Sequence, residues 1–330
     1  MNRYASFFLL IIAVSGVIAF VAWKDFDTSS SSNSALSARR SSTTVERTEA
    51  KSKVSMSVTS SVSQSLAPTL NQRFREAKDY AHFVAEIRPM ATAGNTEAQY
   101  LTAKALKWCA QTMHLYNFIR PNGEVHTLEE VQARFAARPV GISQQDLAMI
   151  YSRCQGFLES PELRKSTESW NEWLDKSADG AYPAAIAQRA ANLELQLILE
   201  SGSSLPHEDR GVGAEAQAKE LALSAAESGD PDAIFLMSDW VRTGNRTDDE
   251  TATLINAWRI LACQKGYDCG PHSDWMISVC SWDPQCADGG TYVNYFQRQL
   301  GNQYYDALRL AKSIDEAITA NDVQTLRSYL

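Results

Sequence analysis

The nine residues Ala-Ala-Glu-Ser-Gly-Asp-Pro-Asp-Ala (225–233) carry the strongest structural signal in this chain. An alanine-rich run of helical character ends at Gly229, and Asp230 and Pro231 are residues that begin helices. Glycine supplies the left-handed backbone conformation that commonly ends a helix. Small alanines on both sides of the turn let two antiparallel helices approach closely. The segment therefore predicts a helical hairpin.

Weaker copies of this segment recur along the chain, each centred on a glycine that we expect at the turn between two helices. The four turn glycines are Gly94, Gly180, Gly229 and Gly266, and in the last copy Cys263 and Cys269 stand near the turn. Gly229 and Gly266 are 37 positions apart, a typical period for helical-hairpin repeats. The spacing from Gly94 to Gly180 is longer and contains an insertion around 121–141.

From residue 70 onward the apolar spacing is helical and no alternating β-pattern occurs, which predicts an all-α domain over 70–330. The hairpin segment at 225–233, with weaker copies at 91–106 and 174–191, resembles the Sel1-like branch of the tetratricopeptide superfamily. The resemblance covers roughly 75–265, with gaps. The aromatic residue usual in that family before the alanine pair is absent in the 225–233 copy.

This resemblance implies an α/α superhelical solenoid of helix hairpins with a concave face for protein or peptide partners. Some secreted members carry disulfides inside each hairpin, as Cys263 would here. We expect an irregular cysteine-rich part at 263–299 and helices at 300–330 that cap the solenoid and cover its apolar end. The disulfides would staple this C-terminal cap.

The N-terminal residues 1–27 predict a membrane segment. Arg3 precedes an apolar run over 5–23, whose 19 residues reach about 28 Å as a helix, just enough to cross the hydrocarbon core. Trp23 suits an interfacial anchor. We expect an uncleaved single-pass anchor in a bacterial inner membrane, with the C-terminal domain in the periplasm. The alternative is a signal peptide cleaved after Ala19, which would leave a soluble periplasmic protein.

Residues 28–69 predict a disordered linker. Half of residues 28–67 are serine or threonine, and aromatic residues are absent there. Such a composition cannot offset the entropy lost on ordering, so the segment would serve as a tether spanning about 35 Å on average.

The charge distribution argues against nucleic acid as a partner. The net charge of the chain is −8. Residues 1–27 are neutral overall and the mildly basic residues 28–67 carry +3, so residues 68–330 carry −11. Binding to a phosphate backbone needs a basic face, which this balance does not indicate.

Six cysteines beside an export signal predict a disulfide framework. Two lie in the first half of the domain, and the last four form two Cys-x5-Cys units. We expect three disulfides, with crossed pairings among the last four left open: Cys109–Cys154, Cys263–Cys269 and Cys280–Cys286. The alternative is a zinc site built from the last four cysteines near His272, although structural zinc usually has closer cysteine spacing.

Motifs for catalysis or cofactors are weak. The glycines at 211–216 superficially fit a dinucleotide-binding loop, but a polar loop precedes them instead of a strand. No nucleophile elbow or P-loop occurs, and we expect no cofactor and no metal; a catalytic pair assembled from distant residues stays open. Trp170 and Trp173 could line a groove, although core packing is the simpler role.

Together these features predict a non-enzymatic envelope protein whose helical scaffold binds a protein or peptide partner in the periplasm. The alternative is a protein that binds or hydrolyses cell-wall material, peptidoglycan or another carbohydrate, through 263–299. That region is rich in Trp, Tyr, Asp and Gly.

Overall fold

A computed structural model describes residues 68–136, 142–201, 212–241, 246–280 and 291–330. All of them belong to one compact unit, 65–330. The predicted anchor at 1–27 and nearly all of the predicted linker lie outside the described residues. None of the helices within the described ranges combines the length and the apolar character that a membrane span requires.

The described residues are helical, with a single isolated antiparallel bridge between Ile119 and Val125 and no strand. This confirms the all-α fold class. In the N-terminal half the elements are α2 (Leu70–Glu76), α3 (Tyr80–Thr92), α4 (Thr96–Leu115), α5 (Leu128–Ala136), α6 (Gln144–Arg153), α7 (Gln155–Glu159), α8 (Pro161–Ser166), the 3-10 helix η1 (Thr167–Ser169), α9 (Trp170–Asp179) and α10 (Pro183–Ser201). In the C-terminal half they are α11 (Val212–Glu227), α12 (Pro231–Met237), the 3-10 helix η3 (Ser238–Trp240), α13 (Asp248–Lys265), α14 (Asp274–Cys280), α15 (Tyr292–Leu300), α16 (Gln303–Thr319) and α17 (Val323–Ser328).

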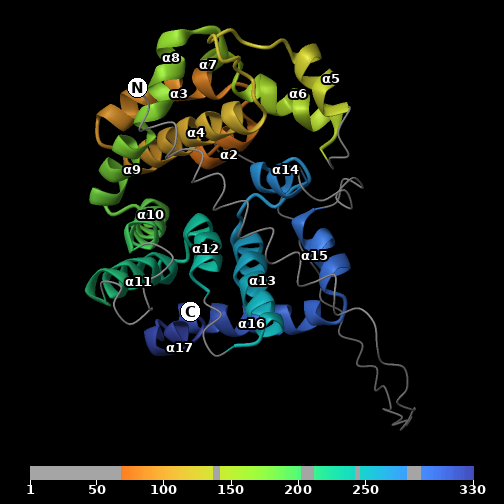
Figure 1. The fold of residues 1–330 in the computed structure, drawn as a ribbon. Coiled ribbons are helices and arrows are strands. Elements are labelled where there is room, and N and C mark those ends of the chain that lie inside the picture. Colours follow the sequence, from red (N-terminus) through yellow and green to blue (C-terminus); the bar gives the residue numbers. More distant parts are fainter. Residues whose placement is uncertain (1–67, 137–141, 202–211, 242–245, 281–290) are drawn as a thin grey trace, which may run out of the picture. The chain divides into compact units, whose positions relative to one another are not determined.

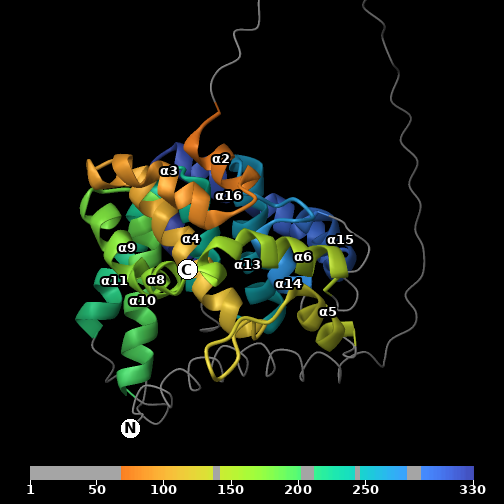
Figure 2. The same cartoon turned by 90° about the horizontal axis from the view of Figure 1, so that it is seen from above.

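The long helices pack on one another largely in chain order (Figure 1). α3 packs on α4, α4 on α9, α9 on α10, and α10 on α11 and α12, after which α12 packs on α13 and α13 on α16. The segment from α5 to α8 is inserted between α4 and α9, which nevertheless contact each other directly. Figures 1 and 2 show α5 and α6 on the opposite side from α10 and α11. The α5–α6 part of the insertion therefore lies beside the helix series, whereas α7 contacts α3 within it.

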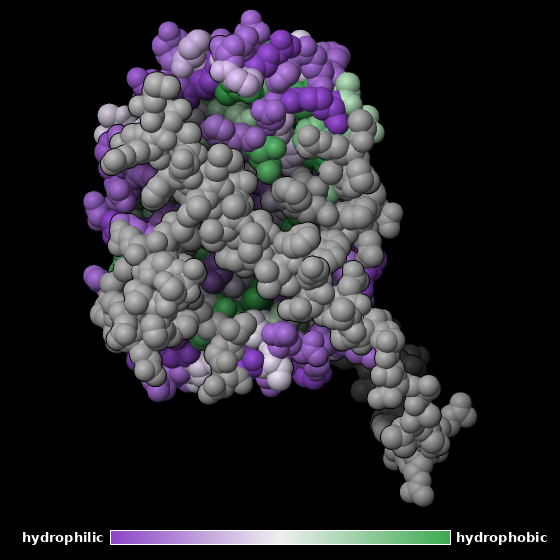
Figure 3. Space-filling view, in the orientation of Figure 1, coloured by the Kyte–Doolittle hydropathy of each residue, from purple (hydrophilic) through white to green (hydrophobic). Residues whose placement is uncertain are grey.

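Two large apolar cores lie along this series. The first is built from residues 74–185 with Ile277 from α14, and the second from residues 190–330. Trp258 is fully buried in the second core, while Trp170 and Trp173 are only partly buried against the first. On the face drawn in Figure 3, most of the described residues that can be seen are hydrophilic, and a smaller number are apolar.

The predicted turns form as the local chemistry dictates, with one difference. Gly94, Gly229 and Gly266 have positive φ angles of 95°, 73° and 106°, the conformation expected of glycine at a helix end. Gly180 instead has φ −80°, and Ala181 takes the left-handed conformation with φ 63°. The prediction for the conformation of Gly180 was therefore wrong by one residue.

Gly180 is required by close packing instead. A Cβ atom at this position would lie 2.2 Å from Cγ2 of Thr96, at the start of α4. The Ser177 hydroxyl donates a hydrogen bond of 2.7 Å to the Thr96 carbonyl oxygen. The end of α9 thus touches the beginning of α4, and only glycine leaves room for that contact.

Two disulfides match the predicted pairs. Cys109 of α4 is bonded to Cys154 at the end of α6, with a Cα–Cα distance of 5.5 Å. Cys263 of α13 is bonded to Cys269 in the following loop, at 5.7 Å. Cys280 is also disulfide-bonded, but Cys286 lies outside the described residues, so that pairing stays a prediction.

The zinc alternative disagrees with this arrangement. Two of its four cysteines are joined to each other, and a disulfide sulfur is not the thiolate that zinc binds. Within the described ranges, no group of three or more His, Cys, Asp or Glu side chains is placed to hold a metal ion.

The contact at Gly180 generates a stability prediction. We expect Gly180→Ala to lower the free energy of unfolding by about 1–3 kcal/mol, because the new methyl group overlaps the Thr96 side chain. Thr96→Ser removes Cγ2 and keeps the hydroxyl, so it should recover much of this loss in the double variant. Urea unfolding of the four proteins measures both effects. An additive double variant would contradict the steric explanation.

Candidate functional site

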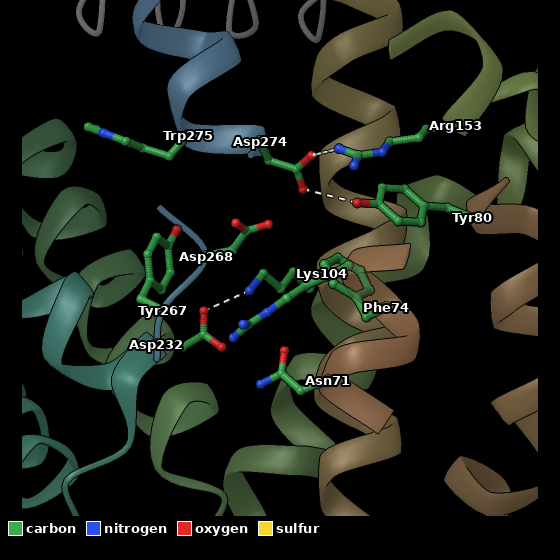
Figure 4. Close-up of a pocket in the computed structure, with 11 residues that line it drawn as sticks. Asn71, Phe74, Tyr80, Lys104, Arg153, Asp232, Tyr267, Asp268, Asp274 and Trp275 are labelled. Carbon is green, nitrogen blue, oxygen red and sulfur yellow. Dashed lines mark hydrogen bonds and ion pairs between the residues drawn. The ribbon is translucent and has the colours of Figure 1, made fainter. Parts of the chain in front are cut away.

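Charged and aromatic side chains gather between the two cores, in a cavity that we call the inter-core pocket (Figure 4). One wall comes from α2, α3, α4 and α6, and the other from α12, the loop after α13 and α14. The lining residues are Asn71, Phe74, Arg75, Tyr80, Lys104, Arg153, Asp232, Tyr267, Asp268, Asp274 and Trp275.

The side chain of Lys104, from α4, lies at the centre of this pocket. Its Nζ lies 2.6 Å from Oδ1 of Asp232, whose side chain is only 6% exposed. The same ammonium lies 5.2, 5.7 and 5.6 Å from the ring centroids of Phe74, Tyr100 and Tyr267. Three rings and one carboxylate thus surround the cation, a favourable cation–π arrangement in a partly desolvated place.

The position of Asp232 follows from the hairpin segment itself. Asp230 caps α12, since its carboxylate accepts a hydrogen bond of 2.9 Å from the Ala233 backbone N–H. Pro231 occupies the first turn, where its missing N–H costs nothing. These two residues start the helix at the point that aims Asp232 toward α4.

A second ion pair lies at the other end of the pocket. Arg153 NH1 is 2.5 Å from Oδ1 of Asp274, and the Tyr80 hydroxyl donates to Oδ2 of Asp274 at 3.1 Å. Figure 4 shows Asp274 facing both partners. Burial raises the pKa of Asp274, and the Arg153 charge opposes that rise. Burial, reinforced by Asp274, raises the pKa of Tyr80 well above its ordinary value, so Tyr80 stays a hydrogen-bond donor.

Further polar contacts join the same two halves of the domain. Arg75 donates to the carbonyl oxygen of Gly266, the turn glycine at the end of α13. His272 Nδ1 lies 3.0 Å from Oδ1 of Asp146, at the beginning of α6. The two cores are therefore connected by ionic and polar contacts as well as by apolar packing.

The inter-core pocket has little free space. Its cavity volume is about 30 Å³, enough for about two water molecules. Its central cations are paired with carboxylates. This arrangement can fix α4 and α6 relative to α12 and α14, and it has no room for an organic substrate.

Lys107, one turn along α4 from Lys104, is different. Its Nζ lies 4.9 Å from the ring centroid of Trp170. No hydrogen bond or ion pair of Lys107 occurs among the described residues. Burial lowers the pKa of Lys107 to about 8, although the negative charge of Asp239 acts in the opposite direction. Lys107 is thus a half-buried cation without a bonded counter-ion.

The other residues singled out in the sequence are distributed as follows. Val212, within the glycine-containing segment, begins α11, and the preceding loop lies outside the described residues. From the region 263–299, Tyr267, Asp268 and Trp275 line the inter-core pocket. The sequence analysis did not identify Lys104. Its partner Asp232 lies in the hairpin segment at 225–233, but nothing in that segment indicates a contact with Lys104.

No protein-family model matches the chain, and neither curated proteins nor solved structures include a match to it.

The Lys104–Asp232 pair generates a second stability prediction. We expect Asp232→Ala to destabilise the protein by about 3 kcal/mol, because it leaves a partly buried ammonium unpaired. Glu316→Ala is the matched control: it breaks the exposed Lys312–Glu316 pair and should cost less than about 1 kcal/mol. Thermal and urea unfolding measure the difference. Equal losses would show that Lys104–Asp232 does not join the cores.

Proposed function

We propose that this protein is a helical-repeat scaffold that binds a peptide segment of a protein partner, with an acidic side chain of that segment bound at Lys107. The observation that carries the proposal is the half-buried ammonium of Lys107, which lies beside the Trp170 ring and has no hydrogen bond or ion pair within the described part of the chain.

The scaffold part of the proposal rests on the packing order of the helices. The pairs α3–α4, α9–α10 and α11–α12 each form contacting neighbours, and each pair contacts the next. We interpret these hairpins as stacked repeats of a superhelical solenoid, with α16 and α17 covering its end as a cap. Stacked repeats present extended surfaces that suit peptide and protein partners.

The binding part rests on the ammonium of Lys107, which has no hydrogen-bond acceptor or counter-ion among the described residues. A carboxylate from a partner would form a charge-assisted hydrogen bond to its ammonium and would compensate for the partial loss of hydration. A neighbouring apolar side chain of the partner would pack on the partly exposed face of Trp170. A short peptide with an acidic residue beside an apolar one meets both requirements.

The cellular setting is part of the proposal. The apolar run at 5–23 would hold the protein in an inner membrane, and the linker would let the helical domain reach partners in the periplasm. The disulfides Cys109–Cys154 and Cys263–Cys269 suit such an oxidising compartment.

The cell-wall alternative, which uses 263–299, has less support from the packing. Tyr267 stacks on Phe235 with ring centroids 4.1 Å apart, and Trp275 packs edge-on against the same ring at 4.9 Å. These two aromatic rings serve internal contacts, so they do not form an open platform for a sugar.

The proposal predicts a charge-dependent selection of peptides. A randomised peptide library captured by the full chain should be enriched in sequences with Asp or Glu next to an apolar residue. Lys107→Met should weaken the best peptide by about tenfold or more. Lys176→Met is the matched control, because Lys176 lies 4.6 Å over Trp173 but is exposed; it should leave binding unchanged.

The same peptide should also lose affinity as the pH rises through 8. With the pKa of Lys107 lowered to about 8, most of its charge is present at pH 7 and lost at pH 9, which corresponds to a decrease of about tenfold. An ordinary lysine would keep its charge over this interval. Calorimetric titrations at both pH values measure the change, and a pH-independent affinity would contradict the role of Lys107.

A stability measurement separates loss of binding from loss of fold. The pKa of Lys107 is lower in the folded state than the ordinary 10.5, so folding disfavours its charged form. This penalty is fully present below pH 8 and disappears as the pH rises toward 10.5. Lys107→Met should therefore raise the melting temperature at pH 7, and the gain should shrink at pH 10. A lower melting temperature at pH 7 would contradict the penalty.

A further inference from the structure

A second hollow lies in the inserted segment, away from the inter-core pocket. Its volume is about 430 Å³, more than ten times that of the inter-core pocket and within the range of small-molecule sites. The hollow, which we call the insertion pocket, is lined by Gly123, Glu124, Val125, His126, Thr127, Tyr151, Gln155, Leu158, Glu159 and Arg164.

The walls of the insertion pocket are tied to each other. The Tyr151 hydroxyl of α6 donates to the His126 carbonyl oxygen at 2.8 Å. Arg164 of α8 donates to the carbonyl oxygens of Gly123 and Leu158 at 3.0 and 3.2 Å. The Cys109–Cys154 disulfide fixes the junction of α6 and α7 on α4. The pocket is therefore held in shape before a ligand arrives, which reduces the entropy lost on binding.

The lining offers both donors and acceptors. Gln155 donates from Nε2 to Oε1 of Glu159 at 2.6 Å, which leaves the other carboxylate oxygen of Glu159 for a ligand. Glu124 supplies a second carboxylate, and Thr127 contributes a hydroxyl. Arg164 forms no ion pair among the described residues and uses backbone carbonyl oxygens as its acceptors.

This combination selects among ligand classes. Glu124 is paired with Arg120 at 3.4 Å, and the Glu159 carboxylate, which has no ion pair among the described residues, disfavours a phosphate or another anion. The guanidinium of Arg164 disfavours a simple cation. A ligand hydroxyl can donate to a carboxylate and accept from an amide or guanidinium N–H at once, so several adjacent hydroxyls satisfy the mixed lining.

We infer that the insertion pocket binds a carbohydrate, as one sugar or a short glycan, through the carboxylate of Glu159 and the polar groups of Gln155 and Arg164. This site is separate from Lys107 and from the region 263–299, so it does not depend on the proposed peptide binding.

The test uses the full chain and a panel of methyl glycosides of glucose, galactose, mannose and N-acetylglucosamine. Open-chain sorbitol and inorganic phosphate serve as comparison probes. Saturation-transfer NMR should show binding of at least one glycoside above the level of sorbitol. Phosphate has no protons for that experiment, so it is tested by calorimetric titration and should give no binding heat. Absence of any glycoside signal above sorbitol, or binding of phosphate in its place, would overturn the inference.

Three variants assign the binding to this pocket. Glu159→Gln removes the charge that strengthens a hydroxyl hydrogen bond and should weaken glycoside binding by about tenfold. Gln155→Trp places a large ring from an exposed position into the pocket and should abolish binding. Glu162→Gln, on exposed α8 but outside the lining, is the matched control and should bind as the unmodified protein does. Glycoside binding that both pocket variants retain would overturn the assignment.

Discussion

The contact between Lys104 and Asp232 is the constraint on which the arrangement of the two cores depends. The two residues are 128 positions apart, yet their charged atoms lie 2.6 Å from each other. Three aromatic rings exclude much of the water around the ammonium. Removing either charge would therefore leave the other unpaired and poorly hydrated, which destabilises the fold. The pair Arg153–Asp274, with a separation of 121, repeats this constraint at the other end of the pocket. The first pair joins α4 to α12 and the second joins α6 to α14, so the two ion pairs connect the same two halves of the domain at two separate points.

Much of the local structure follows from the sequence, because it depends on residues that are close in the chain. Asp230 caps α12, and Thr247 and Glu250 form a capping box at the start of α13. Positive φ angles occur at three of the four turn glycines. Gly180 differs because its neighbour across the turn is Thr96, a residue that no local pattern places there.

The site itself could be predicted only in part. Lysines and aspartates are too common for any spacing to reveal that Lys104 faces Asp232, and the three rings around Lys104 come from α2, α4 and the loop after α13. Such a pocket exists only after the helices have packed. The insertion pocket has the same origin, since a loop around a single β-bridge faces α6, α7 and α8. The sequence marked the insertion at 121–141 but contained no sign of a hollow.

Among the described residues, Lys104, Lys107 and Lys176 lie over aromatic rings, and a comparison of the three favours a ligand at only one. Lys104 has Asp232, so its burial is compensated within the protein. Lys176 is exposed over Trp173 and keeps its hydration. Lys107 has neither a bonded carboxylate nor full hydration, and its lowered pKa expresses the resulting cost. A methionine would fill the same place without that cost. A charge that lowers stability fits the proposed role of Lys107, which is to bind a carboxylate of the partner.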